Sequence, residues 1–221
     1  MKGLKEYITL NESEVSILRP TNKKELVKLI DQRIKEQGPN CDLNDIDVSR
    51  VKDMSNLFAR SSFNGDISDW DVSRVVDMKY MFWCSKFNGD ISKWDVSRVK
   101  DMSHLFENSE FDSDISQWDV SNVKDMRYMF WSSKFNGDIS KWNVSRVKDM
   151  YGMFYNSLFD GDISDWNVSK VTNMSYMFED SHFSGDLSKW NVSRVKDMSY
   201  MFTDSPLEGN EPEWYRPGRL V

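Results

Sequence analysis

A unit of 24 residues repeats along most of this chain without an insertion, and this period constrains the fold more than any other feature. The dipeptide Val-Ser marks each unit, and its valine recurs at Val48, Val72, Val96, Val120, Val144, Val168 and Val192. One unit is too short to bury its own apolar residues, whereas copies stacked in register share a core. The sequence therefore predicts a repeat solenoid of seven units over residues 41–205.

The apolar residues of one unit predict a strand followed by a short helix. In "FNGDISDWDVSRVVDMKYMF", Trp70 and Val72 alternate with polar residues, which is typical of a strand with one buried face. Met78, Met81 and Phe82 then follow at the spacing of one helical face. We therefore expect an α/β architecture with one parallel strand and one short helix in each unit.

The unit "FNGDISKWDVSRVKDMSHLF" resembles the repeat of the BspA-like leucine-rich-repeat surface proteins, also described as the mycoplasma lipoprotein repeat of unknown function. Its Trp-x-Val-Ser…Met…Met-Phe pattern carries the resemblance, which extends roughly from Cys41 to Trp214. The resemblance implies a leucine-rich-repeat-like α/β solenoid and a role at a cell surface or in adhesion. It supplies no catalytic residues.

The two ends of the chain depart from the repeat and are predicted to be caps. Residues 1–40 form the N-terminal capping segment, with an amphipathic helix over 22–37, Thr21 as its N-cap and a stop at Gly38. The apolar stripe of this helix consists of Leu26, Leu29, Ile30 and Ile34. Residues 206–221 form a degenerate C-terminal cap, in which Pro206, Pro212 and Pro217 remove backbone donors from the exposed edge.

Charge and hydropathy exclude several classes of partner at this stage. The formal net charge of −7 gives no reason to expect a polyanion. No apolar run approaches the roughly 20 residues that cross a bilayer, so we expect no membrane span. The first residues lack the apolar region of a signal peptide. These features favour a cytoplasmic or virion-associated protein, whereas the family resemblance favours the cell surface.

Residues that usually carry catalysis are scarce and scattered. The chain has only two histidines, His104 and His182, which take different places in their units. The cysteines Cys41 and Cys84 also fall in different columns, where a column is the set of equivalent positions in successive units. No phosphate-binding loop, dinucleotide fingerprint or Ser-His-Asp arrangement is present. We therefore predict a protein without enzymatic activity and without a cofactor.

One column of aspartates is the best candidate for metal ions. It contains Asp66, Asp90, Asp114, Asp138, Asp162 and Asp186. Stacked carboxylates about 5 Å apart repel one another unless cations or hydrogen-bond donors compensate. Calcium is one way to compensate, but calcium-binding repeats use several Gly and Asp residues in each turn. The alternative, which we favour, is that each aspartate bonds the backbone amides of its own corner.

A second set of columns is basic. It contains Arg50, Arg74, Arg98, Arg146, Lys170 and Arg194, with Lys52, Lys100, Lys124, Lys148 and Lys196 two places further on. Such a stripe invites a nucleic-acid hypothesis. Because aspartates such as Asp53 and Asp71 flank it, lateral salt bridges explain the charges at least as well. The sequence therefore does not favour nucleic-acid binding.

The candidate binding residues are aromatic and lie beside the inward Met-Phe pair. They are Tyr80, Trp83, Tyr128, Trp131 and Tyr155. Other units place Gly, Glu or Asn in the same columns, which indicates surface positions. Exposed Tyr and Trp clusters dock protein partners or sugar rings. The alternative is that each ring only packs over its neighbour's side chain.

These features together predict a non-catalytic binding or adhesion module that recognises a protein or glycan through a repeated surface. Two alternatives remain open at this stage. One is a structural component of a larger assembly such as a virion, and the other is an intracellular interaction scaffold.

Overall fold

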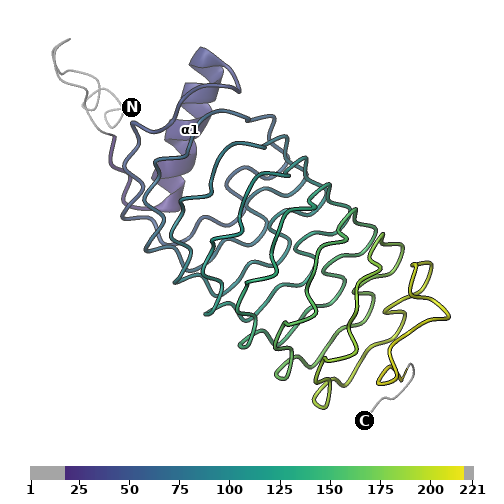
Figure 1. Ribbon diagram of the computed structural model, residues 1–221. Coiled ribbons are helices and arrows are strands. Elements are labelled where there is room, and N and C mark those ends of the chain that lie inside the picture. Colours follow the sequence, from purple (N-terminus) through teal and green to yellow (C-terminus); the bar gives the residue numbers. More distant parts are fainter. Residues whose placement is uncertain (1–17, 217–221) are drawn as a thin grey trace, which may run out of the picture.

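The computed structural model describes residues 18–216, and the chain in this range forms one helix, α1, followed by a stack of rungs. Successive rungs lie side by side from the α1 end to the C-terminal end (Figure 1). Each rung is one 24-residue unit, since backbone hydrogen bonds such as that from the Lys124 N–H to the Lys100 oxygen (2.9 Å) join equivalent residues.

A rung is built from four consecutive hydrogen-bonded turns. In the second unit, the N–H of the fourth residue of each turn donates to the carbonyl oxygen of the first at 2.9–3.2 Å. The four turns begin at Ile67, Val72, Met78 and Phe82 and end at Trp70, Val75, Met81 and Ser85. All eight of these residues are buried. Each turn thus directs its first and last side chains inward and its two central side chains outward.

Short polar side chains fix where the turns begin. The Oδ1 atoms of Asp66, Asp71 and Asp77 each accept a hydrogen bond from the backbone N–H two residues further on, at 2.9–3.0 Å. This Asx arrangement offers the backbone a local partner in place of a helix or strand ladder. After the fourth turn, Ser85 Oγ accepts from the Phe87 N–H at 3.1 Å. The polar residues of the unit therefore specify turns.

The rungs are joined along the third and fourth turns. Alternate N–H groups of one rung donate to carbonyl oxygens 23 residues later, as from Met78 to Asp101 (3.1 Å) and from Phe82 to Leu105 (3.0 Å). Isolated parallel bridges mark the same edge, for example Asp77 with Asp101. The Asp-Met-x-x-Met-Phe segment is thus the main hydrogen-bonded junction of the stack.

The predicted α/β architecture with a strand and a helix in each unit is wrong. Within residues 18–216 the rungs contain no helix, and their pairing is confined to isolated bridges. Trp70 and Val72 alternate because they end one turn and begin the next. Met78, Met81 and Phe82 have helical spacing because two four-residue turns abut there. Tyr80 also has φ +57°, and this left-handed conformation breaks a helix.

The inward side chains form one continuous apolar core. Equivalent phenylalanines such as Phe82 and Phe106 stack with ring centroids 5.7 Å apart and nearly parallel planes. A second column contains Phe63 and Phe87, whose ring centroids are 6.0 Å apart. Burial of large apolar side chains is the main driving force for stacking, because a single rung leaves both of its faces exposed.

Helix α1 (Lys23–Gln37) covers the first rung (Figure 1). Its N-cap is Asn22, one residue after the predicted Thr21, and the Asn22 side chain accepts from the Glu25 N–H. On the inner face, Leu26 and Ile30 are buried. Arg33 forms a two-pronged ion pair with Asp45 of the first rung at 2.7 and 3.1 Å. The part of the predicted capping segment over 1–17 lies outside the described residues.

The last rung is covered by the residues that follow it. The Trp214 ring stacks on Trp190 at 6.4 Å, and its Nε1 donates to the Leu187 oxygen at 2.8 Å. The edge of the Tyr215 ring packs on Phe202, with centroids 5.0 Å apart. The predicted Pro217 lies outside the described residues.

Candidate functional site

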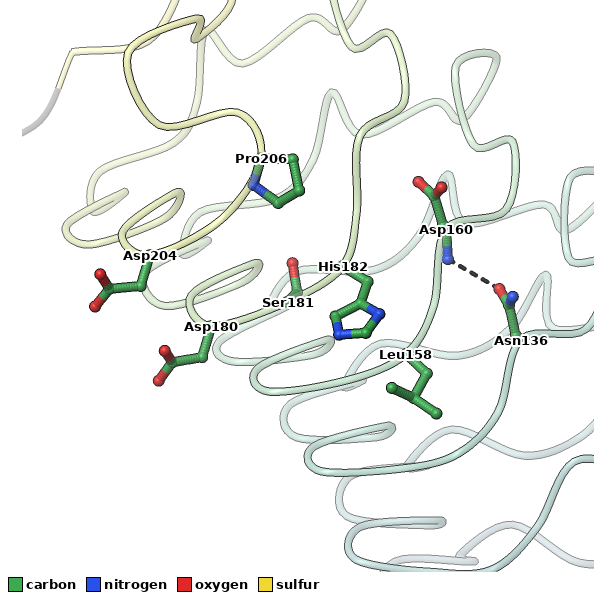
Figure 2. Close-up of a pocket in the computed structure, with 8 residues that line it drawn as sticks. All are labelled: Asn136, Leu158, Asp160, Asp180, Ser181, His182, Asp204 and Pro206. Atoms are coloured by element: carbon green, nitrogen blue, oxygen red, sulfur yellow. Dashed lines mark hydrogen bonds between the residues drawn. The ribbon is translucent and has the colours of Figure 1, made fainter.

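One hollow lies on the surface of the C-terminal rungs, between Asn136 and Pro206, and has a volume of about 770 Å³. Figure 2 shows Leu158 and His182 beside it, together with the carboxylates of Asp160, Asp180 and Asp204. One polar group of the lining is already engaged by the backbone, because Asn136 Oδ1 accepts a hydrogen bond from the Asp160 N–H at 2.9 Å. None of the five aromatic candidates lines this hollow.

The five aromatic candidates share one face of the stack and are all partly exposed. Tyr80 and Tyr128 are the third residues of their third turns, and Trp83, Trp131 and Tyr155 are the second residues of the fourth turns. Because the central residues of a turn point away from the core, all five rings lie on the outside of the third and fourth turns.

The structure extends this group into a continuous aromatic column. The period of 24 places Tyr80, His104, Tyr128 and Tyr176 in one column, and the structure adds the contacts between their rings. Ring centroids are 4.1 Å apart between Tyr80 and His104 and 4.7 Å apart between His104 and Tyr128. Further rings continue the column to the last rung, with centroid distances of 4.8–5.3 Å. The aromatic column consists of Tyr80, His104, Tyr128, Tyr151, Tyr176 and Tyr200.

Tyr151 belongs to the column although it lies one residue before the equivalent position of the repeat. Its rung has Gly152 where the two adjacent rungs have Tyr128 and Tyr176, and the side chain of the preceding residue, Tyr151, lies between those two rings. A Cβ at Gly152 would lie 3.0 Å from the Tyr128 ring. Period-24 alignment alone could not find Tyr151, although a Tyr directly before a Gly was the available signal.

Most residues of the aromatic column adopt a left-handed backbone conformation that is unfavourable for bulky side chains. Tyr80, His104, Tyr128, Tyr176 and Tyr200 have φ between +56° and +60°. Turns with a left-handed third residue prefer Gly or Asn, and such a conformation costs a bulky L-residue about 1–2 kcal/mol. Asn56 and Gly152 show that this chain uses the favoured residues in other rungs. Ring stacking of about 0.5–1.5 kcal/mol for each pair offsets much of the cost.

A buried carboxylate anchors the N-terminal part of this face. Glu107 is 5% exposed, and its Oε1 accepts a hydrogen bond from Trp83 Nε1 at 3.0 Å. Its other oxygen contacts His104 Nδ1. The Arg60 guanidinium lies 4.3 Å from the Trp83 ring centroid. Burial raises the pKa of Tyr80, and the Glu107 charge raises it further.

Trp131 lacks the acceptor that Trp83 has. In the rung that follows Trp131, the position equivalent to Glu107 is occupied by Tyr155, whose ring packs edge-on against Trp131 with centroids 5.6 Å apart. Trp131 Nε1 is buried, and because this acceptor is missing it has no hydrogen-bond partner among the described residues. An unsatisfied buried donor costs roughly 1–3 kcal/mol, so this position is not optimised for stability.

The carboxylates of the aspartate column accept hydrogen bonds from nearby backbone N–H groups. Asp66, Asp90, Asp114, Asp138, Asp162 and Asp186 each accept a hydrogen bond from the serine N–H two residues on, at 2.8–2.9 Å. These bonds lower the pKa of Asp66, and the same cause acts at Asp90. Within residues 18–216, no three His, Cys, Asp or Glu residues are grouped closely enough to hold a metal ion.

The expected lateral salt bridges of the basic columns are absent from the described part of the chain. None of the eleven Arg and Lys residues in those two columns has a carboxylate within 4.0 Å there. The ion pairs that do form use other positions, such as Lys79 with Asp77 (3.6 Å) and Lys189 with Asp165 (3.5 Å). Arg146 donates a hydrogen bond to Asn122 Oδ1, and the charges of both columns are left without an ion-pair partner in the described residues.

The repeat is recognised by a known family model. The family described as "Mycoplasma protein of unknown function, DUF285" matches residues 30–134 and again residues 107–214. The chain belongs to this family. Together the two matches extend over residues 30–214, which include the seven 24-residue units and the C-terminal half of α1. No curated protein and no solved structure matches the chain. Among residues 18–216, no helix has the length and apolarity needed to span a bilayer.

Proposed function

We propose that this protein is a non-catalytic recognition module that binds a protein partner through the aromatic column and the rings of Trp83, Trp131 and Tyr155 beside it. The observation that carries this proposal is the row of partly exposed rings on left-handed backbone. Local strain of this kind concentrates at binding sites, where the side chain is retained for a role other than stability.

The packing of the rings favours a protein over a neutral sugar. A sugar ring binds to the open face of an aromatic ring, but the faces of His104 are covered by Tyr80 and Tyr128. The column therefore presents ring edges and hydroxyl groups to a partner. Tyr and Trp in this arrangement are typical of the centres of protein interfaces. The ring of Tyr200, 55% exposed, ends the column.

The resemblance of the repeat to BspA-like surface proteins supports an adhesion role for this interface. Adhesion requires a stiff support that holds many contacts in fixed positions. A stack with one continuous core and hydrogen bonds between all neighbouring rungs meets that requirement. A rigid surface loses little conformational entropy on binding, so more of the contact energy contributes to affinity.

The test uses substitutions that the fold already accepts. Tyr128→Asn combined with Tyr176→Asn places in the column the residue found at Asn56. Arg98→Gln, on a separate face, is the matched control. Proteins retained by the wild-type chain from a cell-surface extract are purified and titrated against each variant.

We expect the double variant to lose at least about tenfold in affinity, whereas the control retains it. Equal binding by all three proteins would show that the rings only pack against one another. Binding to neutral sugars on a glycan array, lost in the double variant, would replace the protein partner by a glycan. Thermal unfolding must show that the double variant remains folded.

A further inference from the structure

The basic columns form an unpaired cationic surface on an acidic protein. We define the basic stripe as Arg50, Lys52, Arg74, Arg98, Lys100, Lys124, Arg146, Lys148, Lys170, Arg194 and Lys196. All of these side chains are exposed, and none has an ion-pair partner within residues 18–216. The net charge of −7 conceals this segregation.

The N-terminal and C-terminal halves of the stripe differ in the residue that directly precedes the second turn of each rung. In the N-terminal half it is an aspartate, as at Asp71, Asp95 and Asp119, whereas in the C-terminal half it is Asn143, Asn167 and Asn191. Both residue types perform the same structural task, since each Oδ1 accepts from the serine N–H two residues on. The distances are 3.0 Å for the aspartates and 3.1–3.2 Å for the asparagines.

Asparagine therefore keeps the turn and removes the negative charge. The same exchange occurs on the other side of the stripe, where Asn173 takes a position held by Asp149 and Asp197 in neighbouring rungs. Its Oδ1 accepts from the Ser175 N–H at 3.0 Å. Stability of the turn does not require these exchanges, so they point to a demand for positive potential.

Few carboxylates oppose the five cations of the C-terminal half, which are Arg146, Lys148, Lys170, Arg194 and Lys196. Asp165, on the outside of the preceding turn, is paired with Lys189 at 3.5 Å. Asp149 is half-buried, and its Oδ2 lies 3.9 Å from Arg127 Nε, which lies outside the stripe. Asp197 is the remaining acidic neighbour, and its Oδ1 accepts from the Ser199 N–H at 2.9 Å. Five cations therefore stand against three carboxylates along this half.

We propose that the C-terminal half of the basic stripe binds a linear acidic polysaccharide. In one column, Arg146, Lys170 and Arg194 place a cation in every rung, about 4.8 Å apart along the axis of the stack. A polymer with carboxylate or sulfate groups on an extended chain of sugar rings matches such a one-dimensional array. Ser145 and Ser193 lie next to the cations in the sequence and supply hydroxyl groups for the sugar, whereas the Ser169 hydroxyl donates to Asn167 Oδ1 at 2.7 Å.

The same surface fits nucleic acids and membranes less well. Single-stranded nucleic acid is bound with aromatic rings on which bases stack, and the second turns that carry Arg146, Lys170 and Arg194 contain no aromatic residue. A membrane-binding surface usually adds protruding apolar side chains. The exposed apolar residue of the stripe's own columns, Val76, lies in the N-terminal half.

The test adds charge without disturbing the turns. The stripe variant combines Asn143→Asp, Asn167→Asp and Asn191→Asp, which reproduces the natural arrangement at Asp71. The matched control combines Asn64→Asp, Asn88→Asp and Asn136→Asp. It adds the same charge at corners where Asp112 and Asp160 already make the equivalent bond, at 2.9 and 2.7 Å. Heparin is the probe, neutral dextran is the blank, and affinity is measured at several salt concentrations.

We expect salt-sensitive binding of heparin by the wild-type chain and no binding of dextran. The stripe variant should lose at least about tenfold in affinity, while the control should change by less than about threefold because exposed charges beyond roughly 10 Å are screened. Absence of heparin binding, or equal losses in both variants, would overturn the site. Binding of oligothymidylate as tight as that of heparin would overturn the polysaccharide in favour of nucleic acid, and binding only to phosphatidylserine vesicles would overturn it in favour of a membrane.

Discussion

The indole Nε1 of Trp142 donates a hydrogen bond to the carbonyl oxygen of Ile115, 27 residues earlier, at 3.1 Å. The same bond recurs from Trp70 onward in every rung and again at Trp214. The tryptophan thus ties its own turn to the turn of the preceding rung. It combines burial of a large ring with a directional bond that fixes the register of the stack.

Replacement of this tryptophan in the middle of the stack should be costly. We expect Trp142→Phe to lower the free energy of unfolding by about 2–3 kcal/mol, because it removes a buried hydrogen bond and leaves a void. Trp214→Phe is the control, since Trp214 is only partly buried at the end of the stack. Denaturant unfolding of both variants checks this expectation. Equal losses at the two positions would show that position in the stack is unimportant.

Gly152 tests how the aromatic column is packed. Gly152→Ala forces an alanine to adopt φ +55° and places its Cβ 3.0 Å from the Tyr128 ring. We expect a loss of about 1–2 kcal/mol in stability and a weaker Tyr near-ultraviolet signal. Gly209→Ala isolates the backbone part of this cost, because Gly209 also has positive φ (+80°) but no atom within 4 Å of the new Cβ. If the two variants lose the same stability, the contact with Tyr128 contributes nothing.

The sequence predicts which residues face the core but not the local backbone. The period of 24 identifies the inward Trp, Val, Met and Phe positions, because a residue that repeats in every rung meets its own copies. The same spacing of apolar residues fits a strand, a helix or a series of turns. Left-handed residues decide between them here, and a Tyr at φ +57° gives no sequence signal for that conformation.

The candidate surfaces show a similar limit. The columns of Tyr80 and Trp83 are recognisable from the sequence because their residues vary between rungs. The displacement of the Tyr151 ring over Gly152 depends on three-dimensional packing. For the basic stripe, sequence proximity of Arg74 and Asp71 suggests a salt bridge, yet the carboxylate is engaged by the Ser73 N–H. Chain neighbours that belong to a turn therefore need not pair with each other.

The aspartate column should make the fold sensitive to acid. Hydrogen bonds from the Ser68 and Ser92 N–H groups lower the pKa of Asp66 and Asp90 below their ordinary value of 3.8. A lowered folded-state pKa contributes stability that is present above pH 3.8 and is lost as the pH falls through the folded-state pKa. We expect the melting temperature to fall in this acid range. Asp66→Asn with Asp90→Asn, which keeps both acceptors, should flatten the decline, and an unchanged slope would exclude these two groups as a cause.

The aromatic column should be sensitive to alkali, and Tyr128 is the residue that decides this. Burial raises the pKa of Tyr128 well above its ordinary value of 10.0, and the neighbouring Tyr151 raises it further. Because only the unfolded chain ionises readily, stability is complete below pH 10.0 and declines as the pH rises above that value. We expect Tyr128→Phe, which keeps the ring and removes the ionisable hydroxyl, to lose less stability than the wild type between about pH 8 and about pH 11. Tyr200→Phe, at the exposed end of the column, is the matched control for the loss of one hydroxyl group. Denaturant unfolding at each pH, with phenolate absorbance recorded in parallel, measures the effect, and an identical alkaline decline in wild type and Tyr128→Phe would contradict it.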